Sequence, residues 1–181
     1  MKAKECFTTL KYYIKMESLI INPAILTFIT TYTCTSACKN CCFQCSPKRK
    51  EKLTVDEMKQ YIDASIESYS RLKLMVLTGG EPFIYGKKIE DIIQHASKAG
   101  LMTRIVSNGF WAKNYDSAYK RIQSLKEAGL TEINFSTGDD HLEFVPIKTI
   151  KNGALASLRQ GMTVVINVEA AQDRKFDSKF F

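Results

Sequence analysis

The sequence has no run of apolar residues that approaches the ~20 needed for a membrane-spanning helix. Its first residues carry Lys2, Lys4 and Glu5 with no apolar segment behind them, so we expect neither a membrane anchor nor a secretory signal. Low-complexity tracts and linker-like segments are also missing. With 181 residues, 45% hydrophobic and 25% charged, the chain is typical of one globular domain that buries roughly 70% of its unfolded surface.

Basic residues are in excess, but they are not concentrated. The chain has 26 Lys and Arg against 19 Asp and Glu, which gives a net charge of +7. Apart from a Lys-Arg-Lys run at residues 48–50, these charges are scattered, which indicates a solvated surface and does not favour nucleic-acid binding. A basic face would also suit the docking of an acidic electron-transfer protein.

Cysteine is absent from most of the chain. Five of the six cysteines fall within residues 34–45, and the sixth, Cys6, we expect to be uninvolved. A disulfide framework would spread its cysteines along a small secreted domain. Clustering in a chain with no recognisable secretory signal favours a metal site in a reducing compartment, so we expect a cytoplasmic protein.

Three of these cysteines, Cys34, Cys38 and Cys41, form a C-x3-C-x2-C run directly after a strand-like segment. Three thiolates are one fewer than the four that usually complete an iron–sulfur or structural zinc site. A metal held by this run alone would keep one position for something other than protein.

A zinc site is the alternative interpretation, since Cys38-x2-Cys41 and Cys42-x2-Cys45 form two C-x2-C pairs. The pairs abut, however, and leave no segment to wrap a zinc ion, so we favour a cluster held by the first three cysteines. Cys42 and Cys45 are then expected to be small buried or surface thiols, with a second cluster or a substrate-facing role as the other readings.

From residue 25 onward, short apolar strands alternate with helices. The predicted strands have the composition of buried parallel strands and lie at residues 25–31, 74–78, 102–109, 131–138 and 163–169. The predicted helices lie at residues 54–70, 89–96, 116–128 and 146–160. Thr54 and Glu57 form a capping box at the start of the first helix. The expected apolar face of that helix comprises Met58, Tyr61, Ile62, Ile66 and Tyr69.

A repeat is visible in Gly100, Gly129 and Gly161, which recur at a period near ~30 residues, the length of one β-α unit. Each glycine precedes a strand and fits the C-terminal cap of a helix. Five units predict an α/β fold with a parallel sheet. Because a closed barrel needs eight units and about 250 residues, we expect a partial barrel or an open sheet.

The unusual residues of the chain follow the predicted strands. In parallel α/β folds, ligands bind at the carboxyl ends of the strands. Here the cysteine triplet follows the first strand, and polar residues or glycines end the other four, at residues 79–82, 107–109, 136–140 and 167–169. The sequence therefore predicts that these segments meet at one rim.

Together these segments resemble one known family. The C-x3-C-x2-C run, GGEP at residues 79–82, SNG at residues 107–109 and STGDDH at residues 136–141 are similar to motifs of the radical S-adenosylmethionine (radical SAM) superfamily. The resemblance covers residues 25–169 and implies a partial (β/α) barrel.

The resemblance also implies a reaction and its cofactors. Cys34, Cys38 and Cys41 would hold three irons of a [4Fe–4S] cluster, and S-adenosylmethionine would chelate the fourth iron. Reductive cleavage of S-adenosylmethionine would yield methionine and a 5′-deoxyadenosyl radical, which takes a hydrogen atom from a substrate. The cofactor would carry the difficult chemistry, while the protein supplies placement and a water-poor cavity.

Further residues are assigned to S-adenosylmethionine by the resemblance. Gly79, Gly80 and Glu81 would accept bonds from the methionine ammonium, because glycine allows close backbone approach and Glu81 supplies a carboxylate. The other expected contacts, to the methionine carboxylate, the ribose or the adenine, are Ser107, Asn108, Ser136, Asn167 and Glu169.

Two features depart from the family's pattern. An aromatic residue usually precedes the third cysteine, where this chain has Asn40, and Phe43 can supply the adenine contact from the other side of Cys41. Only thirteen residues follow Val168, too few for a sixth β-α unit. We expect residues 1–24 to be an N-terminal extension and residues 25–181 to be an incomplete radical SAM core, a natural truncation or, as we favour, a fragment of a longer chain.

The resemblance suggests partners as well. Reduced flavodoxin or a ferredoxin is the expected electron donor. Residues 136–146 are similar to segments of peptide-modifying members, which points to a peptide substrate, with small molecules and nucleic acids as the alternatives. A non-catalytic cluster-binding protein and a zinc-binding module are the rival classes.

Five other polar or aromatic residues carry separate predictions. His141 is either a proton shuttle or substrate contact, or a hydrogen-bonded structural residue. We expect His95 to be solvated, and Asp139 and Asp140 to cap a helix or form a turn. Trp111 is expected in the core, with a wall of the substrate cavity as the alternative.

Overall fold

The computed structural model describes residues 22–169, so residues 1–21 of the predicted extension and residues 170–181 lie outside the described part. The strands are β1 (Ile25–Thr31), β2 (Leu74–Gly79), β3 (Met102–Ser107), β4 (Glu132–Thr137) and β5 (Thr163–Val168). The helices are α2 (Val55–Ser68), α3 (Lys88–Lys98), α4 (Tyr115–Glu127), α5 (Asp139–Leu142) and α6 (Ile147–Arg159), with a 3-10 turn, η1 (Pro82–Tyr85).

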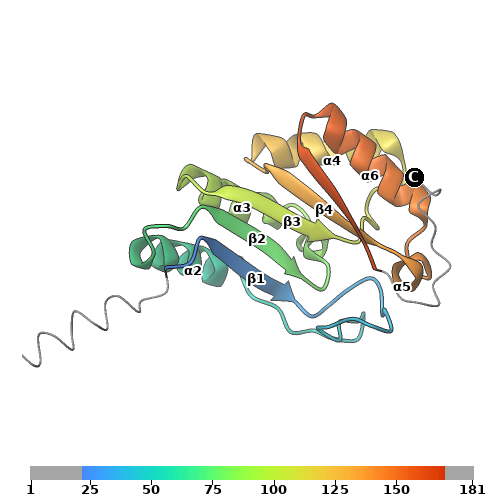
Figure 1. Cartoon of the computed structure of the whole chain (residues 1–181), viewed down its shortest axis with the longest axis horizontal. Helices are drawn as coiled ribbons and strands as arrows, with labels where there is room; N and C mark the ends of the chain where they lie inside the picture. Colours follow the sequence, from blue (N-terminus) through green and yellow to red (C-terminus); the bar gives the residue numbers. More distant parts are fainter. Residues whose placement is uncertain (1–21, 170–181) are drawn as a thin grey trace, which may run out of the picture.

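All five strands are parallel and lie in the order β1-β2-β3-β4-β5. Figure 1 shows the strand arrowheads directed toward one side of the molecule, where the loop after β1 and helix α5 lie. Helices α2, α3, α4 and α6 contact one another in chain order along the sheet. The predicted partial barrel of five β-α units is confirmed, and its strand ends share one rim.

Helix α2 shows how local sequence sets an element and where the helical pattern overstates burial. The predicted capping box is present: Thr54 is the N-cap, its side chain accepts from the backbone N–H of Glu57, and the Glu57 carboxylate accepts in return. The predicted apolar face is too wide, because Tyr61 is 54% exposed and Tyr69 36%. The helix lies at the edge of the sheet beside β1, so only a narrow stripe that includes Met58 and Ile62 is covered.

The three repeated glycines have the conformation expected of helix caps. Gly100, Gly129 and Gly161 follow α3, α4 and α6 and have φ of +85°, +108° and +69°. Each ends a helix just before a strand, which confirms the predicted β-α repeat.

Aromatic packing on the helix side of the sheet positions the loop after β3. Phe135 of β4 is fully buried, and a Cβ on Gly153 of α6 would lie 2.7 Å from its Cζ atom, so glycine lets the helix approach the ring. The Trp111 ring stacks on Phe83 with 4.4 Å between ring centroids and lies 6.2 Å from Phe135. Trp111 therefore packs against the core, as expected, and holds the polar end of β3 in place.

None of the helices in residues 22–169 is both long enough and apolar enough to cross a membrane.

Candidate functional site

The loop after β1 leaves the sheet and returns to it, and its two arms are joined by hydrogen bonds. Tyr32 donates its backbone N–H to Glu51 O, and Ser46 donates to Tyr32 O, while Cys34 donates to Ser46 O. The Thr33 hydroxyl adds a bond of 2.7 Å to Arg49 O. These bonds hold the segment between Cys34 and Ser46 out beyond the end of β1, at the rim.

Three thiols of this loop face one cavity. Cys34, Cys38 and Cys41 are half-buried and line a cavity of about 250 Å³ at the strand ends. The exposed Cys42 and the buried Cys45 also line it, and the Cys45 backbone N–H lies 3.4 Å from Cys41 Sγ. The structure thus brings the predicted cysteine triplet together and adds two thiols at its margin.

The environment of Cys34 and Cys38 favours their neutral form in the absence of a cation. Burial, together with the neighbouring Cys34 and Cys41, raises the pKa of Cys38 to about 12, because burial disfavours the charged form and adjacent thiolates would repel each other. Burial likewise raises the pKa of Cys34. A metal centre supplies the positive charge that deprotonates such a set, so metal binding here would release protons.

Most of the predicted cofactor residues line the same cavity. Besides the three cysteines, these are Gly79, Gly80, Ser107, Asn108, Ser136 and Glu169. Two predicted contacts do not line it, Glu81 and Asn167. Asn167 is exposed on β5, although it pairs in register with Ser136 of β4. That these residues bind S-adenosylmethionine stays a prediction.

The two glycines at the end of β2 permit close contact with the cysteine loop. A Cβ on Gly80 would lie 2.0 Å from Thr33 O, and one on Gly79, whose φ is +111°, would lie 2.7 Å from Thr31 O. Their absent side chains let the Gly80 N–H donate to Thr31 O at 2.6 Å. The end of β2 can therefore present its backbone to the cavity beside the thiols.

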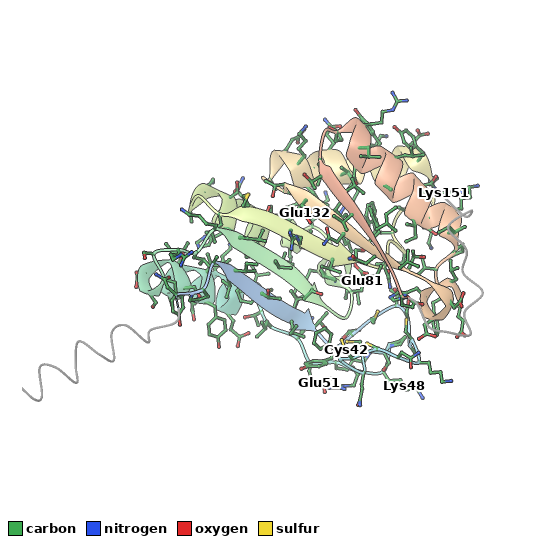
Figure 2. The ribbon with its side chains drawn as sticks, viewed as in Figure 1. Cys42, Lys48, Glu51, Glu81, Glu132 and Lys151 are labelled. Carbon is green, nitrogen blue, oxygen red and sulfur yellow. The ribbon has the colours of Figure 1, made fainter. Side chains whose placement is uncertain are left out.

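Glu81 is a buried clamp between two strand ends. Its carboxylate accepts from the Asn108 backbone N–H at 2.8 Å, the Ser107 hydroxyl at 3.0 Å and the Phe83 backbone N–H at 3.1 Å. Burial raises the pKa of Glu81 to about 7, although these three donors oppose the shift. Figure 2 shows Glu81 inside the molecule among the strand ends. Its oxygens are directed at the end of β3, so the geometry indicates that Glu81 positions the residues of the site and does not itself line the cavity.

Asn108 extends this clamp to the cysteine loop. Its side-chain amide donates to Thr35 Oγ1 at 2.9 Å and Ser36 Oγ at 3.1 Å, and lies 3.7 Å from Cys34 Sγ. The Ser36 backbone N–H also lies 3.4 Å from that sulfur. Donors aimed at a sulfur ligand favour its thiolate form and tune an iron–sulfur centre. Neither this role of Asn108 nor Ser36 could be predicted from the sequence, because the x3 spacing of the motif leaves the identity of residue 36 unspecified.

The opposite wall joins β4, β5 and the cysteine loop. His141 Nδ1 lies 2.6 Å from a carboxylate oxygen of Glu169, and the other oxygen accepts from the Asp140 backbone N–H at 2.6 Å. The Asp140 carboxylate in turn accepts from the Asn40 backbone N–H at 3.0 Å. All four residues line the cavity, so His141 faces it and has a carboxylate partner. Asp139 begins α5 beside this wall.

Two remaining predicted residues take defined places. Phe43 lines the cavity, at the position where an adenine contact is predicted. The sequence predicts a solvated His95, but the structure gives it a partner. Its ring lies 2.7 Å from Asp63 Oδ1, and this contact links α3 to α2.

The donor set fits a cluster with one open position. Three thiols share one cavity, two bonds from Asn108 and Ser36 reach Cys34, and the other walls are polar backbone and side chains. Within residues 22–169, no three His, Cys, Asp or Glu side chains are placed so that they could hold a single metal ion. In a [4Fe–4S] cluster each cysteine binds a different iron.

Comparison with known proteins identifies one family. The family model described as the radical SAM superfamily matches residues 28–150, more than half of the chain. A search of curated proteins finds no match.

Solved structures share the fold at low sequence identity. Methylornithine synthase (PylB) has a TM-score of 0.60 and 16% identity over 80% of this chain and 44% of its own. BtrN in complex with AdoMet and 2-DOIA has a TM-score of 0.56 and 15% identity over 81% and 56%. Streptococcus suis SuiB bound to the precursor peptide SuiA has a TM-score of 0.55 and 14% identity over 94% and 46%. The chain thus spans about half the length of these proteins.

Proposed function

Because the chain belongs to the radical SAM superfamily, we propose that Cys34, Cys38 and Cys41 hold a [4Fe–4S] cluster whose fourth iron binds S-adenosylmethionine. Membership implies S-adenosylmethionine-dependent radical chemistry with an iron–sulfur cluster. When bound, the cluster supplies one electron that splits S-adenosylmethionine into methionine and a 5′-deoxyadenosyl radical for hydrogen abstraction.

One observation carries this proposal. The three cysteines and residues from the ends of β2, β3, β4 and β5 line one cavity of about 250 Å³. Such convergence of all strand ends on a metal-binding loop is what a cofactor held between cluster and barrel requires.

The residues of the cavity have distinct proposed roles. The open backbone at Gly79 and Gly80 accepts from the methionine ammonium, because a carbonyl next to glycine can approach a ligand closely. Ser136 contacts the ribose of S-adenosylmethionine. Glu169, together with its partner His141, contacts the same cofactor at the far wall of the cavity. Glu81 acts through Ser107 and Asn108 and keeps these two residues facing the cavity.

We further propose a peptide substrate. The support is the likeness of residues 136–146 to segments of peptide-modifying members and the fold shared with SuiB, which was solved with a precursor peptide. The test is incubation with a short peptide encoded beside the gene, followed by mass spectrometry. The expected result is a change in the mass of the peptide, such as the loss of hydrogen atoms that accompanies a new bond. Formation of 5′-deoxyadenosine with an unchanged peptide counts against this substrate.

The reaction itself is tested by anaerobic reconstitution with iron and sulfide, followed by dithionite and S-adenosylmethionine. The expected products are methionine and 5′-deoxyadenosine, quantified by chromatography. The Cys38→Ala variant should form neither, and Cys42→Ala should form both. A protein that binds the cluster and forms no 5′-deoxyadenosine would be a non-catalytic relative, and one that takes up zinc instead would be a zinc-binding module.

A further inference from the structure

The loop that carries the cysteines has a basic outer side. Residues 34–52 contain one acidic residue, Glu51, and five basic ones: Lys39, Lys48, Arg49, Lys50 and Lys52. The four lysines are exposed, and none of them lines the cavity. Figure 2 shows Lys48 and Glu51 on this loop at the outer edge of the molecule.

The single acidic residue of the loop does not offset the lysines. Arg49 Nε lies 2.9 Å and 3.1 Å from the two carboxylate oxygens of Glu51, and Arg49 Nη2 lies 2.8 Å from one of them. The bond to Arg49 is the main reason why the pKa of Glu51 falls to about 2. The Arg49 guanidinium also lies 4.7 Å from the centre of the Tyr32 ring. Arg49 and Glu51 therefore cancel each other and brace the loop.

No acidic residue of the described chain neutralises the four lysines. In the described part of the chain, no ion pair includes any of the four. Lys50 Nζ donates to Pro47 O, a neutral carbonyl. The loop thus presents four positive charges with no anionic partner among residues 22–169.

The inner side of the same loop carries the thiols. Cys34, Cys38 and Cys41 face the cavity, and the other cavity walls are strand ends backed by the sheet and by helix α5. An electron that reaches a centre held by these thiols by the shortest route crosses this loop, and electron transfer between proteins weakens steeply with distance. A donor that docks on the lysines would be held where that distance is smallest.

We propose that the outer side of residues 39–52 is the docking surface for an acidic one-electron donor protein. The inference rests on the proposed function and adds to it the surface and the charge of the partner. Positive and negative patches steer association and raise the rate of encounter, and the effect weakens as salt rises. The side chains of Lys48 and Lys52 have no hydrogen bond or ion pair with another residue of the described chain, so their charge can serve a partner.

The experiment compares two charge-reversed double variants against one probe, a flavodoxin. Lys48→Glu/Lys52→Glu alters the loop, and Lys148→Glu/Lys151→Glu makes the same change of charge on exposed residues of α6, where Figure 2 shows Lys151 well away from Lys48. Binding of oxidised flavodoxin is measured by calorimetry at low and high salt. Reduction of the reconstituted protein by photoreduced flavodoxin is followed by stopped-flow absorbance.

The expected result is an affinity about 10-fold or more lower for the loop variant at low salt, with the α6 variant near wild type, since reversing two rim charges turns attraction to an acidic partner into repulsion. The wild-type affinity should fall with added salt. Equal binding by the loop variant and wild type, or equal losses in both variants, overturns the proposal.

Dithionite separates this inference from the proposed function. Dithionite needs no docking surface, so the loop variant should form 5′-deoxyadenosine with dithionite at the wild-type rate. If no protein forms 5′-deoxyadenosine with dithionite, the proposed function fails, whereas the binding data still decide the docking surface on their own.

Discussion

At the scale of single residues, the site separates groups that face the cavity from groups that hold them there. Gly79, Gly80 and Ser136 line the cavity, while the conspicuous carboxylate of the GGE motif, Glu81, lies beneath it and accepts three hydrogen bonds from the ends of η1 and β3. Asn108 then carries the connection to Cys34. This chain of contacts predicts two measurable effects.

Removing the Asn108 amide should alter the iron–sulfur centre without loosening β3. The Asn108→Ala variant loses the side-chain bonds to Thr35, Ser36 and Cys34 but keeps the backbone bond to Glu81. Because a donor near a ligand sulfur favours the more negative, reduced cluster, its loss should shift the reduction potential to more negative values. The measurement is an EPR-monitored redox titration.

Asn40→Ala is the matched control for this titration, since Asn40 is bonded at the site through its backbone N–H, which the alanine variant keeps. The control should keep the wild-type potential. If Asn108→Ala keeps it too, the contact with Cys34 has no influence on the centre. Urea unfolding should show a loss of about 1–3 kcal/mol for Asn108→Ala, because the buried Ser36 hydroxyl and the Phe110 backbone N–H lose their Asn108 partners.

Glu81 should make the stability of the cluster-free protein depend on pH. Burial raises its folded-state pKa to about 7, against an ordinary value of 4.5, so between these values the folded protein holds a proton that the unfolded chain has released. The contribution of Glu81 to the free energy of unfolding is thus complete below about pH 4.5 and is lost as pH rises through about 7. Urea unfolding at a series of pH values measures this slope.

The Glu81→Gln variant should be less stable overall and should lack this slope, because its amide cannot titrate and its NH2 group faces a backbone donor. Glu143→Gln, a change at an exposed residue, should keep the wild-type slope. A slope that persists in Glu81→Gln would show that another group causes it.

At the scale of elements, the site depends on how closely β2 approaches the cysteine loop. The end of β2 runs against Thr31 and Thr33, and its two backbone N–H bonds to these residues pin the loop at the rim. Neither bond is possible if a side chain separates the two segments.

Gly80→Ala should therefore disturb the cysteine loop. Its Cβ would lie 2.0 Å from Thr33 O, a backbone atom that cannot move without shifting the loop. We expect a stability loss of about 1–3 kcal/mol from overpacking, together with less iron retained after reconstitution. Unfolding in urea and iron analysis measure the two effects.

Gly100→Ala is the control, since its added Cβ meets nothing within 4 Å although φ is +85°. It should be less stable by about 1–2 kcal/mol from backbone strain and should retain full iron. Full iron retention in Gly80→Ala would mean that close approach of β2 does not shape the loop.

The elements also show what the sequence can and cannot predict. The five strands and four long helices follow from local signals, namely apolar periodicity, the Thr54–Glu57 capping box and the recurring glycine caps. The four-residue segments η1 and α5 escape prediction because a periodic pattern needs more residues than they have. Tyr61 escapes because a helix at the edge of a sheet is covered over a narrower face than its sequence suggests.

For the site, the sequence predicts which segments meet but not how their side chains point. Parallel strand ends share a rim, so the cysteines, Ser107 and Ser136 could be placed together from their positions in the chain alone. The inward turn of Glu81, and the amide of Asn108 near Cys34, depend on contacts between residues more than 25 positions apart. Such contacts follow from the packing of β2 and β3 and leave no local signal.

At the scale of the whole molecule, one cavity joins every strand of the described sheet to the cysteine loop. Its walls come from the cysteine loop and the ends of β2, β3, β4 and β5, and Asp140, Glu169 and Asn40 close the ring of contacts between β4, β5 and the loop. A ligand that fills this cavity should therefore stabilise the fold as a unit.

S-adenosylmethionine should raise the unfolding temperature of the cluster-loaded protein. A ligand present at 100 times its dissociation constant adds about 2.7 kcal/mol to the free energy of unfolding. Much less stabilisation is expected in the cluster-free protein, where one partner of the ligand is missing. Differential scanning calorimetry under anaerobic conditions makes the comparison. Equal shifts with and without the cluster would argue against binding at its open iron.

In the proposed site, three thiolates bind three irons and leave the fourth for S-adenosylmethionine. EPR spectra of the reconstituted, dithionite-reduced protein before and after addition of S-adenosylmethionine test it most directly. We expect a [4Fe–4S] signal whose g values shift on addition, in wild type and in Cys42→Ala, and no such signal in Cys34→Ala, Cys38→Ala or Cys41→Ala. A cluster signal that S-adenosylmethionine leaves unchanged, or one that survives the loss of any of the three cysteines, would contradict it.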